Sequence, residues 1–92
     1  MTFKRVLRDS GLNKSELATL FGVSRQTIHT WSNGGEPREG SYTARMQSSI
    51  TAALCAALDK RILPLSAMER ERRVARVESM ARQLQNLKPS PA

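Results

Sequence analysis

Residues 13–34 read NKSELATLFGVSRQTIHTWSNG, and their pattern predicts two short helices separated by a tight turn. Asn13 is a favourable N-cap residue, and Glu16, three positions later, can complete a capping box with it. Gly22 falls where the first helix has to end, because glycine accepts the positive φ that such a corner requires. Ser24 is a second N-cap residue, and it opens a helix that ends before Gly34.

The two predicted helices are about eight residues long and have the spacing of a helix-turn-helix unit. Ile28 and Trp31 lie three positions apart and predict the buried face of the second helix, so the opposite face is expected to be exposed. The seven positions that set the angle between the helices are Leu17, Ala18, Phe21, Gly22, Val23, Ile28 and Trp31. The exposed face carries hydrogen-bonding side chains and no acid: Arg25, Gln26, His29, Thr30 and Asn33.

This arrangement resembles the phage repressor and Cro-type (Xre-like) helix-turn-helix family of DNA-binding proteins. The resemblance covers residues 2–62 as a fold and is specific over residues 13–37, where Trp31, Gly34 and Pro37 form part of the pattern. It implies that the residue at the position of Lys14 touches the DNA backbone. It also implies that the residues at the positions of Arg25 and Gln26 touch bases.

The exposed face suits the major groove, where each base pair shows a distinct pattern of donors and acceptors. Arg25 has the forked geometry that pairs with guanine, Gln26 can pair with adenine, and Thr30 can offer its methyl group to thymine. His29 either reaches a base or phosphate or is simply a surface residue. The expected base contacts are Arg25, Gln26, His29, Thr30 and Asn33. The expected phosphate contacts are Lys14, Ser24, Thr27 and Arg38, although Glu36 and Glu39 share the loop of Arg38.

Composition sets the broader frame. A chain of 92 residues suits one small domain, and its net charge of +7 favours a polyanionic partner.

Cys55 is the single cysteine, so the sequence offers neither a disulfide framework nor a metal-ligand cluster, and we expect Cys55 to be a small core residue. The chain has one histidine and no glycine-rich phosphate loop, so we expect no catalytic residues, no cofactor and no metal. No stretch reads as a signal peptide or membrane span, which predicts a cytoplasmic protein of a bacterial cell or phage-infected host.

The remaining segments predict an all-α fold of five helices, a repressor-like domain with a long C-terminal helix. Residues 2–9 read as a first helix that Thr2 can cap, and residues 33–41 as a loop rich in glycine. Residues 42–62 read as a long helix, because apolar residues recur every four positions at Met46, Ile50, Leu54, Leu58 and Ile62.

A last helix is predicted over residues 67–87, opened by a capping box of Ser66 and Glu69. Its narrow apolar stripe consists of Val74, Val77, Ala81 and Leu84. This stripe either packs back on the core of its own chain or forms a seam with a second copy, and we favour the seam. The expected organisation is therefore a DNA-binding domain over 1–63 with its motif at 14–33, an oligomerisation helix over 64–87 and a disordered tail over 88–92.

We expect sequence-specific binding of double-stranded DNA by a homodimeric transcriptional regulator, a repressor or autoregulator that reads an inverted repeat. Small-molecule ligands and membranes are not expected as partners. One alternative is a DNA-packaging adaptor similar to small terminase subunits, in which the last helix would build a ring of eight or more copies. The other is a helix-turn-helix protein co-opted as a protein-binding inhibitor, whose polar face would be idle on DNA.

Overall fold

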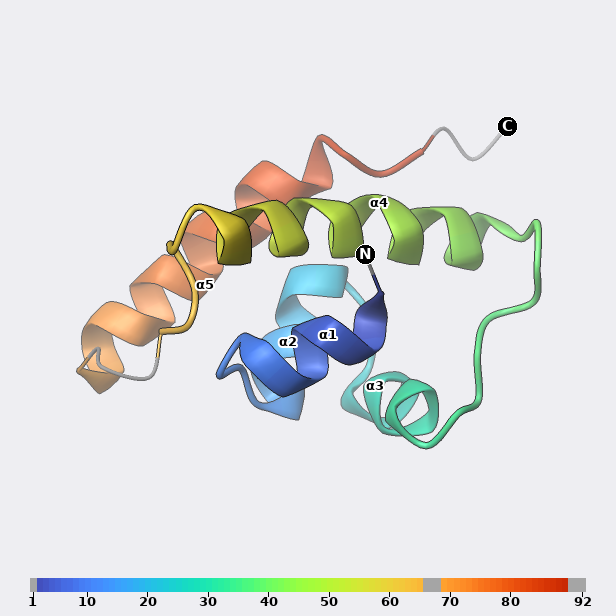
Figure 1. Ribbon diagram of the computed structural model, residues 1–92, viewed down its shortest axis with the longest axis horizontal. Helices are drawn as coiled ribbons and strands as arrows, with labels where there is room; N and C mark the ends of the chain where they lie inside the picture. The colour runs from blue at the N-terminus through green and yellow to red at the C-terminus, as the bar shows by residue number, and fades with distance from the viewer. Residues whose placement is uncertain (1, 66–68, 90–92) are drawn as a thin grey trace.

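The computed structural model describes residues 2–65 and 69–89, and within these ranges the chain is all-helical with five helices (Figure 1). They are α1 (Phe3–Asp9), α2 (Lys14–Phe21), α3 (Arg25–Ser32), α4 (Tyr42–Asp59) and α5 (Arg70–Gln85). The predicted fold class is confirmed. No helix in the described residues is both long enough and apolar enough to cross a membrane.

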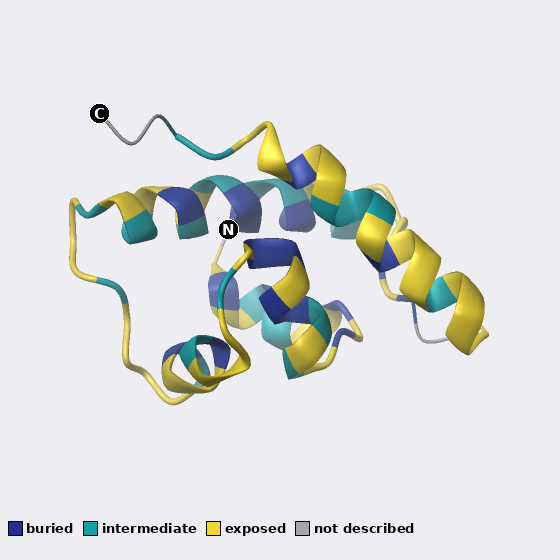
Figure 2. Cartoon of the chain, turned by 180° about the vertical axis from the view of Figure 1, so that it is seen from behind, coloured by how far each residue is buried: buried dark blue, intermediate teal, exposed yellow. Residues whose placement is uncertain are grey.

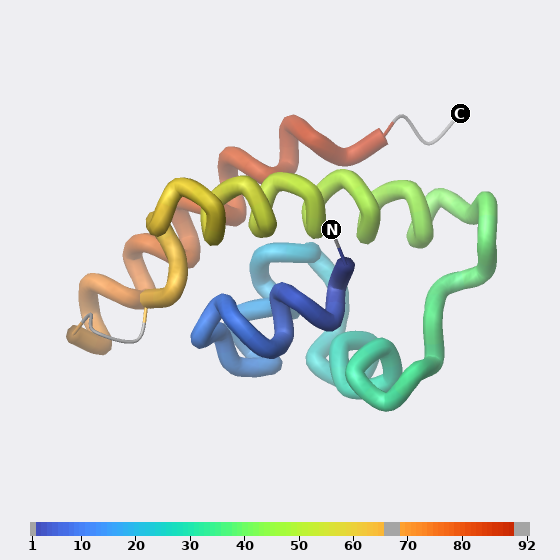
Figure 3. Tube along the Cα trace, in the orientation of Figure 1, coloured from blue at the N-terminus to red at the C-terminus, as the bar shows by residue number. Residues whose placement is uncertain are grey.

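Helix α2 lies at the centre of the molecule, because it contacts α3, α4 and α5. Helix α4 runs along one side of the bundle and packs on α1 (Figure 1). The loop between α3 and α4 extends outward from the bundle and leads to the N-terminal end of α4 (Figures 1 and 3). The buried residues of all five helices form one continuous core, and the outer side of α5 is exposed (Figure 2). The described chain therefore folds around a single core.

Three aromatic rings, one from each of α1, α2 and α3, meet in the core. Phe3 of α1, Phe21 of α2 and Trp31 of α3 contact one another edge to face, with centroids 5.4 to 5.7 Å apart. This geometry is the favourable one for aromatic pairs. It holds the three helices of the N-terminal half together.

The helix ends of the predicted motif are confirmed. The side chain of Asn13 accepts a hydrogen bond from the Glu16 amide, and the Glu16 carboxylate accepts one from the Asn13 amide. Gly22 adopts the left-handed conformation, with φ of 69°, and the amides of Gly22 and Val23 both donate to the carbonyl of Ala18. Two eight-residue helices, α2 and α3, follow from these signals.

The predicted helix over 42–62 is shorter in the structure, because α4 ends at Asp59. Arg61 takes a positive φ of 60°, and the amide of Ile62 donates to the carbonyl of Ala57 across the reversed chain. Ile62 is consequently 45% exposed, and the prediction that it continues the buried stripe is wrong. Leu63 and Leu65 are buried in its place, while Cys55 lies fully buried within α4 as expected.

Helix α5 begins three residues later than predicted and ends two residues earlier. Ser66 lies outside the described residues, so its capping role is not described; Glu69 is the N-cap residue, without a capping hydrogen bond from its side chain. Of the predicted tail, the described residues are Lys88 and Pro89. Lys88 lies across the α2–α3 turn, with its Nζ 2.5 Å from where a Cβ on Gly22 would be.

The stripe on α5 packs mainly within its own chain. Val77 and Leu84 are buried in the same core as the helix-turn-helix, and Ala81 is partly buried against it. Val74 alone of the four predicted seam residues is half exposed. Val77 and Leu84 thus pack within their own chain on the shared core, and Val74 is the residue of the four most open to a second copy. The seam with a second copy stays a prediction.

Candidate nucleic-acid interface

Helix α3 turns one face inward and the other outward, as its spacing predicts. Ile28 is fully buried and Trp31 is 7% exposed, and both belong to the shared core. Arg25, Gln26 and His29 are exposed. The burial of the apolar face therefore fixes which side chains α3 can offer to a partner.

The N-terminus of α3 is held by Ser24 and Thr27. The Ser24 side chain accepts a hydrogen bond of 3.0 Å from the Thr27 amide, and the two hydroxyl oxygens lie 2.8 Å apart. Both hydroxyls are thus engaged in the cap. The remaining amides of the first turn point out of the helix end, where the helix dipole also favours an anion such as phosphate.

Four of the predicted contact residues meet in one place. Lys14 from the start of α2 and Arg25, Gln26 and His29 from α3 line a shallow hollow of about 490 Å³. None of the four is acidic, and two carry a full positive charge. The structure therefore brings together one predicted phosphate contact and three predicted base contacts.

His29 lies between Lys14 and Asn33. Its Nδ1 is 2.8 Å from the Nζ of Lys14, and its Nε2 is 3.1 Å from the Nδ2 of Asn33. A lysine ammonium only donates, so the Nδ1 of His29 is the acceptor in this contact. The side-chain amide of Asn33 lies against the other ring nitrogen. Lys14 is thereby held beside the exposed face of α3.

Thr30 and Arg38 lie apart from this hollow. The Thr30 hydroxyl donates to the carbonyl of Gln26, and its methyl group lies 2.5 Å from where a Cβ on Gly35 would be. The methyl group therefore lies beside the backbone after α3, and its contact with thymine stays a prediction. Arg38 is exposed on the loop between α3 and α4 and is not among the residues that line the hollow.

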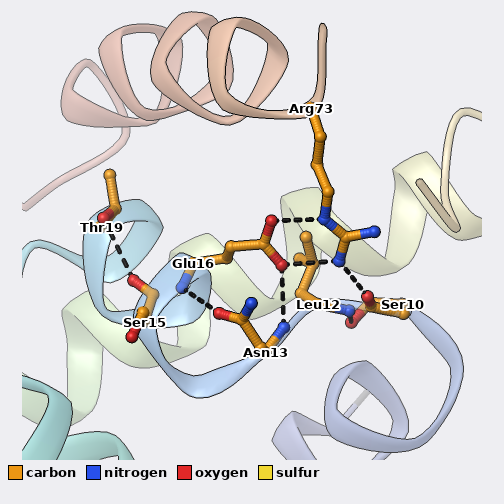
Figure 4. Close-up of polar contacts among 8 residues, drawn as sticks. Ser10, Leu12, Asn13, Ser15, Glu16, Thr19 and Arg73 are labelled. Carbon is orange, nitrogen blue, oxygen red and sulfur yellow. Dashed lines mark hydrogen bonds and ion pairs between the residues drawn. The ribbon is translucent and has the colours of Figure 1, made fainter. Parts of the chain in front are cut away.

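One contact at the N-terminal end of α2 is not among those predicted from the sequence. Arg73 of α5 reaches the capping box of α2 and binds both oxygens of Glu16, at 2.5 Å through Nε and 2.6 Å through Nη2 (Figure 4). Its Nη2 also donates to the carbonyl of Gly11. The Arg73 hydrogen bonds lower the pKa of the Glu16 carboxyl against the opposing effect of burial, and the same pair raises the pKa of Arg73.

Only one of the two residues of this ion pair can be recognised from the sequence. Glu16 is recognisable as the third residue of a capping box, but α5 carries several arginines at similar spacing. Which of them faces α2 follows only from the packing of Val77 and Leu84.

The side chains that line this surface are hydrogen-bonding and cationic. The described residues contain no group of three His, Cys, Asp or Glu side chains arranged to hold a metal ion. The Lys14–Arg25–Gln26–His29 hollow offers donors and positive charge, which suit an anionic, hydrogen-bonding partner. Comparison with family models, with curated proteins and with solved structures finds no match to this chain.

Proposed function

We propose that this chain binds double-stranded DNA in a sequence-specific manner, with α3 in the major groove. The observation that carries the proposal is the hollow lined by Lys14, Arg25, Gln26 and His29, opposite the buried Ile28 and Trp31. A face of this kind, carried on a helix anchored by its apolar side, fits a groove that admits one α-helix. The net charge of +7 adds attraction to the phosphate backbone.

Each side chain has a role in this proposal. Arg25 pairs with a guanine and Gln26 with an adenine, because both lie in the first turn of α3, where a recognition helix meets base edges. Lys14 binds a phosphate beside the groove with the N–H groups of its ammonium that are not donated to His29. The contact with His29 keeps Lys14 at this position.

We further propose that the protein acts as a transcriptional regulator in which two copies read an inverted repeat. A single module of this size buries roughly 600–1,000 Å², and two modules on half-sites about 34 Å apart multiply the selectivity. The seam between copies differs from the four-residue stripe, since Val77 and Leu84 are already buried, and it includes Val74, which is half exposed.

The experiment begins with selection of a preferred duplex from a pool of random sequences. Fluorescence anisotropy then compares the selected and a random duplex for wild type, Arg25→Ala and the control Arg72→Ala. Both variants remove one exposed arginine and one positive charge, but Arg72 lies on α5. Arg25→Ala is expected to lose about 1–3 kcal/mol on the selected duplex and much less on the random one. Arg72→Ala is expected to leave the ratio unchanged, and equal ratios for the two variants would contradict base reading by α3.

Two further measurements test the phosphate contact of Lys14 and the binding of two copies to one duplex. Lys14→Ala is expected to weaken all duplexes alike and to reduce the steepness of log K against log salt by about 0.9, the value of one phosphate contact. Sedimentation of the complex on the selected duplex is expected to give two copies per duplex. One copy per duplex at saturation would remove the homodimer from the proposal.

A further inference from the structure

We propose that Arg73 is a positioning residue for the DNA-binding surface: by locking the N-terminal turn of α2, it places Lys14 against the backbone of the duplex. The proposal rests on the proposed function. It assigns to α5 a part in DNA binding, because α5 supplies a side chain that orders the contact surface without touching it.

The ion pair is well placed for this role. The side chains of Arg73 and Glu16 are only 20% and 14% exposed, and the guanidinium contacts both carboxylate oxygens. Paired forks of this type fix orientation as well as distance. The Nη2 of Arg73 also donates to the carbonyl of Gly11, so the link from α1 into α2 is held by the same group.

Glu16 passes this constraint to the start of α2. Its Oε1 accepts from both Arg73 and the amide of Asn13, the latter at 2.9 Å. The Asn13 side chain accepts in turn from the amide of Glu16 at 2.8 Å. Lys14 is the next residue after Asn13 and the first residue of α2, and its ammonium lies 2.8 Å from His29 of α3.

Polar contacts therefore connect α5 to the capping box, and the peptide bond from Asn13 to Lys14 connects the capping box to the hollow beside α3. Loss of Arg73 would leave a partly buried carboxylate without its cation, and the first turn of α2 would become free to fray. Recognition side chains have to be held within about 0.5 Å of their working positions. Fraying at Asn13 would consequently weaken the phosphate contact of Lys14.

The test compares Arg73→Gln with the control Arg72→Gln, the neighbouring exposed arginine on α5, each with and without Lys14→Ala. Anisotropy with a random duplex is measured over a range of salt, under conditions in which Trp31 fluorescence shows every variant fully folded. We expect Arg73→Gln to reduce the salt slope by about 0.9, as Lys14→Ala does. We also expect no further reduction in the double variant, because both changes remove one and the same contact. Arg72→Gln should add its own small effect to that of Lys14→Ala.

A merely structural role for Arg73 would not produce this lack of additivity. If wild type binds DNA but the effects of Arg73→Gln and Lys14→Ala on the salt slope are additive, the positioning role alone is overturned. The same holds if Arg73→Gln cannot be distinguished from Arg72→Gln. Wild type that fails to bind DNA overturns the proposed function and this inference with it. Amide hydrogen exchange without DNA adds a separate readout: Arg73→Gln should speed exchange at Glu16 and Leu17, whose amides donate to Asn13, and Arg72→Gln should not.

Discussion

Substitution of Gly22 separates backbone strain from crowding at the turn between α2 and α3. Gly22 has φ of 69° and ψ of 35°, a conformation that costs a residue with a Cβ about 1–2 kcal/mol. Alanine recovers about 0.4–1 kcal/mol by restricting the unfolded chain. The expected loss for Gly22→Ala is therefore about 1 kcal/mol, or a fall in Tm of about 4–8 °C for a domain of this size.

Crowding predicts a different order of variants. A Cβ at Gly22 would lie 2.5 Å from the Nζ of Lys88, but this atom is the far end of a flexible side chain and can move away. Asn tolerates the left-handed region better than alanine although it is larger. If strain dominates, Gly22→Asn costs less than Gly22→Ala; if crowding dominates, it costs more.

Urea unfolding followed by circular dichroism and by Trp31 fluorescence supplies the free energies. Gly40→Ala is the matched control, since Gly40 has φ of 79° and no atom within 4 Å of the position of its Cβ. It should cost about as much as Gly22→Ala. A larger loss for Gly22→Asn than for Gly22→Ala, abolished in a Lys88→Ala background, would refute the strain argument.

Three other outcomes are expected. Ile28→Ala should cost about 2–5 kcal/mol in urea unfolding, since Ile28 is fully buried, whereas the exposed Gln26→Ala should change stability by less than about 0.5 kcal/mol. Arg61→Gly should raise the unfolding free energy by up to about 1 kcal/mol, because Arg61 is exposed and has φ of 60°; a loss would show that its side chain contributes more than its strain costs. Arg73 lowers the pKa of Glu16 in the folded state, so this pair stabilises the protein above the ordinary glutamate pKa and the effect is lost as pH falls through the folded value. The stability difference between wild type and Glu16→Gln should therefore shrink on acidification, and a difference independent of pH would contradict the linkage.

The helix-turn-helix was predictable because its signals are local. The capping box of Asn13 and Glu16, the glycine at the corner and the cap at Ser24 each act within four residues, and each is present in the structure. The exposed face of α3 follows from the spacing of Ile28 and Trp31 alone.

The features that the sequence did not predict depend on contacts between residues far apart in the chain or on an unusual backbone conformation. The stripe of Val77 and Leu84 has the same spacing whether it meets α2 or a second copy, so the pattern could not choose between them. Helix α4 ends earlier than predicted because Arg61 adopts a positive φ, and an arginine in the sequence does not indicate that conformation. The pairing of Glu16 with Arg73 spans 57 residues and exists only once α5 has docked.

The buried position of Cys55 has a practical consequence. It is the one thiol in the chain and is fully shielded by the core around α4. A thiol-specific reagent can therefore reach it only when α4 separates from its neighbours, and the rate of modification reports how often that opening occurs. The wild-type protein thus carries its own probe of conformational opening, and no residue has to be changed to introduce one.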